Sequence, residues 1–231
     1  MAFIWDDINR RYYDDEGNEI DDAVLREWIS AFAVSLAVPF RERAERLQKA
    51  IIDLALSAGN ATDGFGTDAP DAADVPTPSE AAAEFQQAFF AWANDTANEI
   101  YAATLATTLI AFGGQSNATA DQFLFAETQA QEQIGFWEQF AAAVAAGGAS
   151  TAYIAARSEM YAASTYASFA NGVRYREGSA GMREERRYLG AADHCTTCLE
   201  QAAIGWVAIG SLRRIGDSEC KTRCRCYFRF R

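Results

Sequence analysis

All five cysteines of this 231-residue chain lie near its C-terminus, in two groups. Cys195 and Cys198 are separated by two residues, and Cys220, Cys224 and Cys226 follow after a gap. Two thiols at this spacing can bind one metal ion from a tight turn, and a second close pair completes a tetrahedral sulfur site. The spacing therefore predicts a structural metal site of the zinc-ribbon type.

The predicted ligands are Cys195, Cys198, Cys224 and Cys226. A single residue between the last two is a tight spacing, so Cys220 can replace either of them, and His194 is a further candidate ligand. Zinc fits such a set because it takes four sulfur or nitrogen ligands tetrahedrally and needs no redox chemistry.

Disulfide bonds and an iron–sulfur cluster are the alternatives for these cysteines. Five is an odd number, and the first residues lack the basic start and apolar run of a secretory signal, which argues against disulfides. A particle released from a cell nevertheless meets oxidising conditions. Four cysteines suffice for an iron–sulfur cluster, but one short motif among arginines does not favour it. A structural zinc ion is the favoured interpretation.

Basic residues surround the cysteines. Residues 172–231 hold 12 of the 20 Lys and Arg but only 7 of the 32 Asp and Glu, so this tail is basic and residues 1–171 are acidic. The arginines predicted to contact nucleic acid or a partner are Arg213, Arg214, Arg223, Arg225, Arg229 and Arg231. A zinc ribbon that binds nucleic acid through this tail is therefore the alternative function.

Short strands are predicted in the same tail. Residues 202–212 place β-branched residues and a tryptophan between glycines, and residues 227–230 are mostly aromatic. Because so few strands bury little apolar area, a bound metal is expected to supply the missing stability.

Apolar residues at helical spacing predict a mainly α body. One stripe runs from Leu25 to Leu54, and Pro39 is expected to kink or split that helix. Further helices are predicted from Ser79 to about Ile110, from Ala120 to about Ala146 and from Ser150 to about Ala170. Aromatic residues on these helices are assigned to bundle packing, and residues 10–20 to a small hairpin or extended arm.

The expected architecture is an elongated helical bundle, or a set of helical hairpins, with a small metal-stapled α+β domain. Its parts are an N-terminal arm and kinked helix (1–58), a linker or long loop (59–79), a helical body (80–171) and a basic cysteine-rich domain (172–231). Polar side chains interrupt every apolar stretch before about eighteen residues, so no membrane span is expected and the chain is predicted to be made in a cytoplasm.

Catalysis has little support in the residues. The chain has one histidine, beside the cysteines, and neither a Gly-rich phosphate loop after a strand nor a nucleophile elbow. The protein is therefore predicted not to be an enzyme.

The order of motifs in the tail resembles the C-terminal part of phage minor head proteins of the Mu F-like head morphogenesis family. These motifs are Asp193-His194-Cys195-Thr196-Thr197-Cys198, Gly205-Trp206, Ile209-Gly210 and Cys224-Arg225-Cys226. In that family, His-Pro usually precedes the terminal Cys-Arg-Cys; here Thr222-Arg223 stands nearby, and Cys220 is additional. The resemblance covers this segment alone.

The resemblance implies a structural virion protein of a tailed phage, a minor head component near the portal or neck that aids head assembly or DNA packaging. Its implied partners are portal, capsid or neck proteins, with several copies in an assembly and DNA contact through the basic tail. The implied location is the virion, after synthesis in the host cytoplasm.

Overall fold

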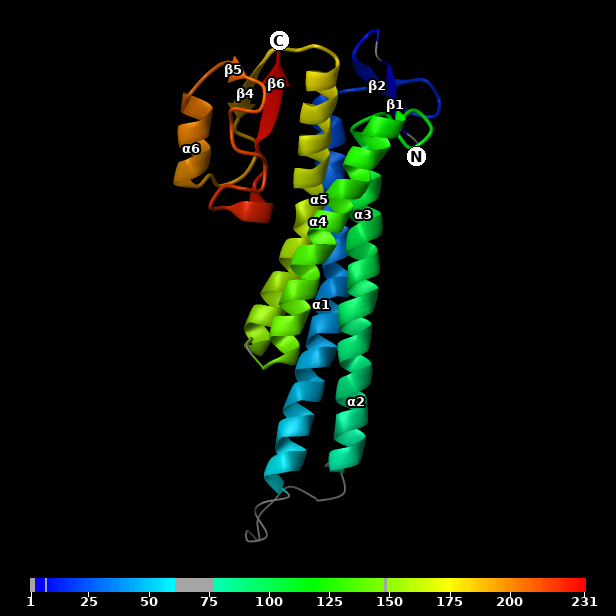
Figure 1. Ribbon diagram of the computed structural model, residues 1–231, viewed down its shortest axis with the longest axis vertical. Coiled ribbons are helices and arrows are strands. Elements are labelled where there is room, and N and C mark those ends of the chain that lie inside the picture. The colour runs from blue at the N-terminus through cyan, green and yellow to red at the C-terminus, as the bar shows by residue number, and fades with distance from the viewer. Residues whose placement is uncertain (1–2, 7, 61–76, 148) are drawn as a thin grey trace.

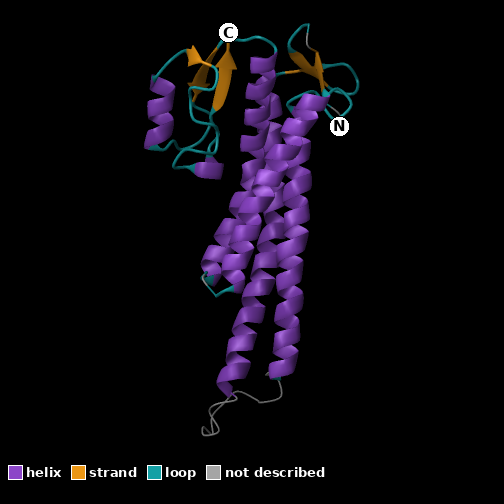
Figure 2. Ribbon diagram, in the orientation of Figure 1, coloured by secondary structure: helices purple, strands orange, loops and turns teal. Residues whose placement is uncertain are grey.

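Long helices dominate the computed structural model, which describes residues 3–6, 8–60, 77–147 and 149–231. The bundle consists of α1 (Asp22–Asn60), α2 (Pro78–Phe90), α3 (Thr96–Ile110), α4 (Ala120–Ala145) and α5 (Thr151–Ser179). α1 packs mainly against α5, and α3 packs against both α4 and α5. The bundle is elongated, and all strands gather at one end of it (Figures 1 and 2). The expected mainly α fold with a small C-terminal α+β region is confirmed.

Pro39 lies inside one continuous helix, so of the two expected outcomes the split is wrong and the kink stays a prediction. Buried side chains hold both sides of the proline in place, with Ile29 and Ala33 before it and Phe40 and Ala44 after it. Tertiary packing of an amphipathic face supplies most helix stability in proteins and here outweighs the hydrogen bond that proline removes.

α2 begins earlier than the sequence indicates, at a capping box built by Thr77 and Glu80. Thr77 accepts a hydrogen bond from the Glu80 backbone N–H, and the Glu80 side chain accepts one from the Thr77 backbone N–H. Most of the predicted linker 59–79 lies outside the described residues. Its ends, residues 59–60 and 78–79, belong to α1 and α2.

α5 extends to Ser179, beyond its expected end near Ala170, so the boundary at residue 172 falls inside a helix. By sequence, Asn171-Gly172 indicates a helix end. The structure shows a packing role for Gly172 instead, because a Cβ atom there would lie 2.8 Å from the Cβ atom of Ala111. The glycine therefore allows a close approach to the end of α3.

A central aromatic core joins the bundle helices around Trp92 and Trp137, whose ring centroids lie 4.7 Å apart. The Trp137 indole N–H donates to the carbonyl of Ala93 at 2.8 Å, in the π-helical turn η1 (Ala91–Asp95) that connects α2 to α3. The aromatic residues of these helices therefore form a packed seam, as their spacing predicts.

Two small sheets flank the top of the bundle. The N-terminal sheet pairs β1 (Ile4–Asp6), β2 (Arg11–Tyr13) and β3 (Glu19–Ile20) antiparallel, which confirms the hairpin expected within residues 10–20. The C-terminal sheet has the order β5-β4-β6, with β4 (Glu184–Tyr188) between β5 (Val207–Ala208) and β6 (Tyr227–Phe230). The sequence predicts β6 but not β4. Of the predicted strand 202–212, only β5 forms, and residues 202–203 end the helix α6 (Thr196–Ala203).

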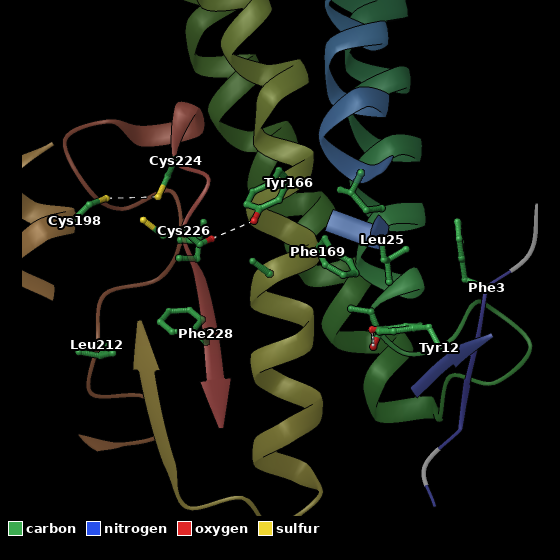
Figure 3. Close-up of a cluster of buried hydrophobic side chains, with 14 residues drawn as sticks. Phe3, Tyr12, Leu25, Tyr166, Phe169, Cys198, Leu212, Cys224, Cys226 and Phe228 are labelled. Atoms are coloured by element: carbon green, nitrogen blue, oxygen red, sulfur yellow. Dashed lines mark hydrogen bonds between the residues drawn. The ribbon is translucent and has the colours of Figure 1, made fainter. Parts of the chain in front are cut away.

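The two sheets and the bundle share one hydrophobic core. It includes Phe3 and Tyr12 from the N-terminal strands, Phe169 from α5, and Cys198 and Phe228 from the C-terminal region (Figure 3). The cysteine-rich region is therefore docked on α5 rather than attached by a linker.

One helix of the described chain, α1, is long and apolar enough to cross a membrane by length and composition alone. Core helices of other proteins pass the same test, and α1 packs along its length against α5 and α2. The expected absence of a membrane span therefore stays a prediction.

Replacing Trp137 by alanine tests the aromatic core. Trp137 is buried, and its loss is expected to lower the free energy of unfolding by about 3–5 kcal/mol. The neighbouring Phe136 is 56% exposed, so Phe136→Ala is a matched control with an expected loss below about 1 kcal/mol. Urea unfolding followed by circular dichroism measures both, and equal losses would contradict this assignment.

Candidate metal centre

The first cysteine pair lies at the start of a helix, not in a free turn. Cys195 is the N-cap residue of α6, and Cys198 lies in the first turn, where its backbone N–H donates to the Cys195 carbonyl at 3.0 Å. A helix N-terminus favours negative charge, so this position stabilises thiolates.

The second group enters the cluster from a tight turn and a strand. Cys220 precedes the short 3-10 helix η2 (Lys221–Arg223), Cys224 follows it, and Cys226 comes directly before β6. Lys221 has φ +46°, an uncommon conformation for a non-glycine residue, and its carbonyl accepts the Cys224 backbone N–H at 3.1 Å. This turn reverses the chain and directs the second group of thiols toward α6.

The five sulfur atoms form two overlapping groups that share Cys198. Cys195, Cys198 and Cys220 make one group, and Cys198, Cys224 and Cys226 make the other; within each group all sulfur atoms lie within 4.8 Å of one another. The Sγ of Cys198 is 3.4 Å from that of Cys220 and 3.6 Å from that of Cys224, as Figure 3 shows for the latter.

These separations suit a tetrahedral metal site. A Zn–S bond of about 2.3 Å implies sulfur atoms about 3.8 Å apart. All five cysteines are free, and the sulfur separations exceed the disulfide bond length of about 2.05 Å. The cluster can therefore hold a metal ion. Cys198 belongs to every arrangement, and the structure places Cys220 as close to it as Cys224.

His194 lies at the edge of the cluster. Its Nδ1 atom is 3.8 Å from the Sγ of Cys226, and its Nε2 atom lies 2.9 Å from the carbonyl oxygen of Gly190. A Cβ atom on Gly190 would lie 1.9 Å from the carbonyl oxygen of Arg225, so only glycine allows this loop to pack there. The imidazole is thereby oriented as a reserve ligand.

Hydrogen bonding within the cluster gives the thiols different pKa values. The contact with the Cys226 thiol lowers the pKa of Cys224 to about 5, and the same contact raises the pKa of Cys226. Burial raises the pKa of Cys198. Metal ions bind thiolates, so Cys224 presents a ready ligand at neutral pH and the other thiols release protons as the metal binds.

A buried arginine supports the cluster from the inner face of the sheet. Arg187 is 1% exposed; its guanidinium donates to the Ser218 hydroxyl at 2.9 Å and to the carbonyl of Arg214 at 3.2 Å, and it lies 3.8 Å from the Sγ of Cys198. Such surrounding hydrogen bonds orient ligands and favour their charged form.

Glu185, on the same face of β4, is also buried. It pairs with Arg174 of α5 and accepts the backbone N–H groups of Gly210 and Leu212. Sequence reasoning missed Glu185 and Arg187, because it predicted no strand in this charged segment. The sequence carries no alternation of apolar and polar residues here, and only the structure shows that every second residue of β4 is buried.

The six predicted contact arginines lie on different elements. Arg214 pairs with Glu132 of α4, and the guanidinium of Arg225 lies over the Tyr166 ring. Arg229 and Arg231 lie on or beside β6, over Tyr188 and Trp206 respectively. The remaining two are also exposed: Arg213 lies in the loop that precedes Cys220, and Arg223 ends η2.

Comparison of the chain with protein-family models, curated proteins and solved structures finds no match. The resemblance to phage head proteins therefore rests on the C-terminal motifs alone.

Cys198→Ser is the sharpest test of the cluster, because both groups of sulfur atoms contain Cys198. The parent protein, purified under reducing conditions, is expected to carry about one metal equivalent and the variant close to none. Cys220→Ser is the matched control and is expected to keep most of the metal, since Cys224 and Cys226 complete the predicted set. Equal metal content in the parent and Cys198→Ser contradicts the assignment.

Arg187→Lys tests whether Arg187 supports the cysteine cluster from the inner face of the C-terminal sheet. Lysine keeps the charge but cannot reproduce the planar fork that binds Ser218 and the carbonyls around residue 214. The expected result is a lower melting temperature and faster metal loss to a chelator. Arg213→Lys, on an exposed arginine of the same region, is expected to change neither.

Proposed function

We propose that this chain is a structural virion protein of a tailed phage, a minor head component at the portal or neck that aids head assembly or DNA packaging. It acts in several copies beside portal, capsid or neck proteins, and it is not an enzyme. Zinc is the proposed metal, and it holds the C-terminal region in shape. The motif order around the cysteines supports the phage assignment.

An apolar face of α1 that is largely exposed, with Phe3 in contact with it only at Trp28 among its four residues, carries the proposal of an assembly role. Only 22% of the most apolar stretch of α1 is buried. Val24, Trp28, Val34 and Val38 are all exposed by 38% or more and recur at helical spacing, so they share one side of the helix. An apolar face of this kind marks a protein interaction site.

The shape of the molecule suits the same role. The face lies on the upper half of α1, near the end of the bundle where both sheets gather (Figure 1). Asp21 and Glu27 lie near one end of the face and Arg41 and Glu42 near the other, and these residues offer charged rims around an apolar centre. The protein can thus bind partner subunits laterally through a rigid helix.

Placing charge on the face tests this interpretation. Val34→Glu with Val38→Glu is expected to abolish incorporation into particles, because burying two carboxylates at an interface is unfavourable. The folded monomer is expected to keep its melting temperature, since both positions are exposed. Ala55→Glu with Ala58→Glu adds the same charge at two exposed positions near the other end of α1 and is expected to leave incorporation unchanged.

Incorporation is measured by immunoblotting of purified particles, and position by immunogold labelling. The proposal predicts label at one vertex of the head. Absence of the chain from purified particles contradicts the virion assignment. Normal incorporation of the Val34→Glu, Val38→Glu variant contradicts the role of the α1 face.

A further inference from the structure

Strand β6 is an edge strand of the C-terminal sheet, with β4 on one side of it. Glu184 and Arg231 exchange two backbone hydrogen bonds, so in the antiparallel register every second residue of β6 bonds to β4. Phe228 and Phe230 occupy the positions between. Their backbone N–H and C=O groups therefore point away from β4, along the other side of the strand.

The outward-facing backbone groups of β6 lack partners. Cys226 lies two residues before Phe228, and its carbonyl accepts a hydrogen bond from the Tyr166 hydroxyl at 3.3 Å (Figure 3). The N–H and C=O groups of Phe228 and Phe230 have no hydrogen-bond partner among the described residues. Two donors and two acceptors, two residues apart, are thus left at the edge of the sheet. This is the pattern that an added β-strand completes.

A cleft of about 550 Å³ lies beside β6, and all four residues of the strand line it. Its other lining residues belong to the N-terminal sheet, including Glu19 and Ile20 of β3, and to the start of α1. We call it the β6 cleft; it lies at the end of the bundle where both sheets gather (Figure 1). A folded sheet that paired with β6 would place its second strand about 4.8 Å farther out, against these walls. The cleft therefore favours a single extended segment over the edge of a second folded sheet.

Charges in the β6 cleft are balanced. Four arginines and three carboxylates line it, and one of these arginines, Arg10, pairs with Glu177 outside the cleft. Arg11 pairs with Glu19 across β2 and β3. A polyanion would meet carboxylates as well as arginines, so the lining favours an uncharged segment held by its backbone.

A second cavity, of about 190 Å³, adjoins the β6 cleft and shares Phe228 and Phe230 with it. Its wall is largely apolar and includes Phe169 and Val173 of α5. The two buried charges in the wall, Arg176 and Glu177, pair with each other at 2.7 Å. Side chains of a strand alternate between its two faces, so a strand beside β6 directs every second side chain toward this cavity. The cavity suits one large apolar side chain.

We propose that β6 binds an extended segment of a partner polypeptide as an added strand, with one large apolar side chain of that segment in the adjoining cavity. The free backbone groups of Phe228 and Phe230 provide affinity, and the cavity selects the side chain. The proposal stands whether or not the protein belongs to a virion. It is also separate from the α1 face, whose four residues do not line the β6 cleft.

Selection from a displayed library of random peptides of about 12 residues, against the full metal-loaded chain, tests this. The expected outcome is enrichment of peptides that carry large apolar residues at alternate positions. An enriched peptide, synthesised with a fluorescent label, is then measured by anisotropy. Val173→Phe fills the cavity and is expected to weaken binding at least about tenfold while the melting temperature is kept or raised. Val34→Phe makes the same change at a position of α1 that is 64% exposed and is expected to leave binding unchanged.

Amide hydrogen exchange, followed by NMR on the parent chain, locates the peptide without any variant. In the free chain, the amides of Phe228 and Phe230 are expected to exchange faster than those of Tyr227 and Arg229, which bond to β4. Bound peptide is expected to slow exchange of the first pair at least about tenfold.

Three results overturn the proposal. The first is a selection that enriches no peptide of this pattern. The second is peptide binding that survives Val173→Phe or leaves both edge amides fast. The third is slow exchange of Phe228 and Phe230 without peptide, together with self-association in sedimentation, which would assign the β6 edge to a second copy of the chain.

Discussion

The sulfur atom of Cys198 is the point on which the cysteine-rich C-terminal region after α5 depends. Its contacts with Cys220 and Cys224 join the start of α6 to the turn before β6. Between α6 and that turn, the described chain forms only the strand β5. The elements around it are short, with two residues in β5 and eight in α6. Backbone hydrogen bonds of so few residues do not hold a chain in place, and a metal ion bound by the thiols would supply the missing stability.

This junction also determines which charges of the sheet are buried. Because the cysteine loops pack onto the inner face of β4, Glu185 and Arg187 lose solvent and gain partners from α5, the 210–214 loop and Ser218. The same packing leaves Arg186 and Arg229 outside, opposed and unpaired by carboxylates of the described chain. The buried charged residues of β4 thus stabilise the fold, and the charged residues on its other face are partly exposed to partners.

The sequence predicted those features that depend on local spacing. Helical periodicity located α4 closely, and the cysteine spacing indicated that thiols distant along the chain meet at one site. Prediction failed where the deciding neighbour is remote: Gly172 continues α5 because Ala111 lies against it, and Pro39 stays helical because both of its flanks are buried. β4 was missed because its buried charges gain meaning only from Arg174 and Ser218. Cys220 could not be ranked among the ligands without the turn at Lys221.

X-ray absorption at the zinc edge of the purified, zinc-loaded chain tests the central claim most directly. A structural site built by this cluster predicts at least three sulfur neighbours at about 2.3 Å, with the fourth ligand sulfur or the nitrogen of His194. Zinc surrounded only by oxygen or nitrogen, or a folded chain that takes up no zinc under reducing conditions, would contradict the account.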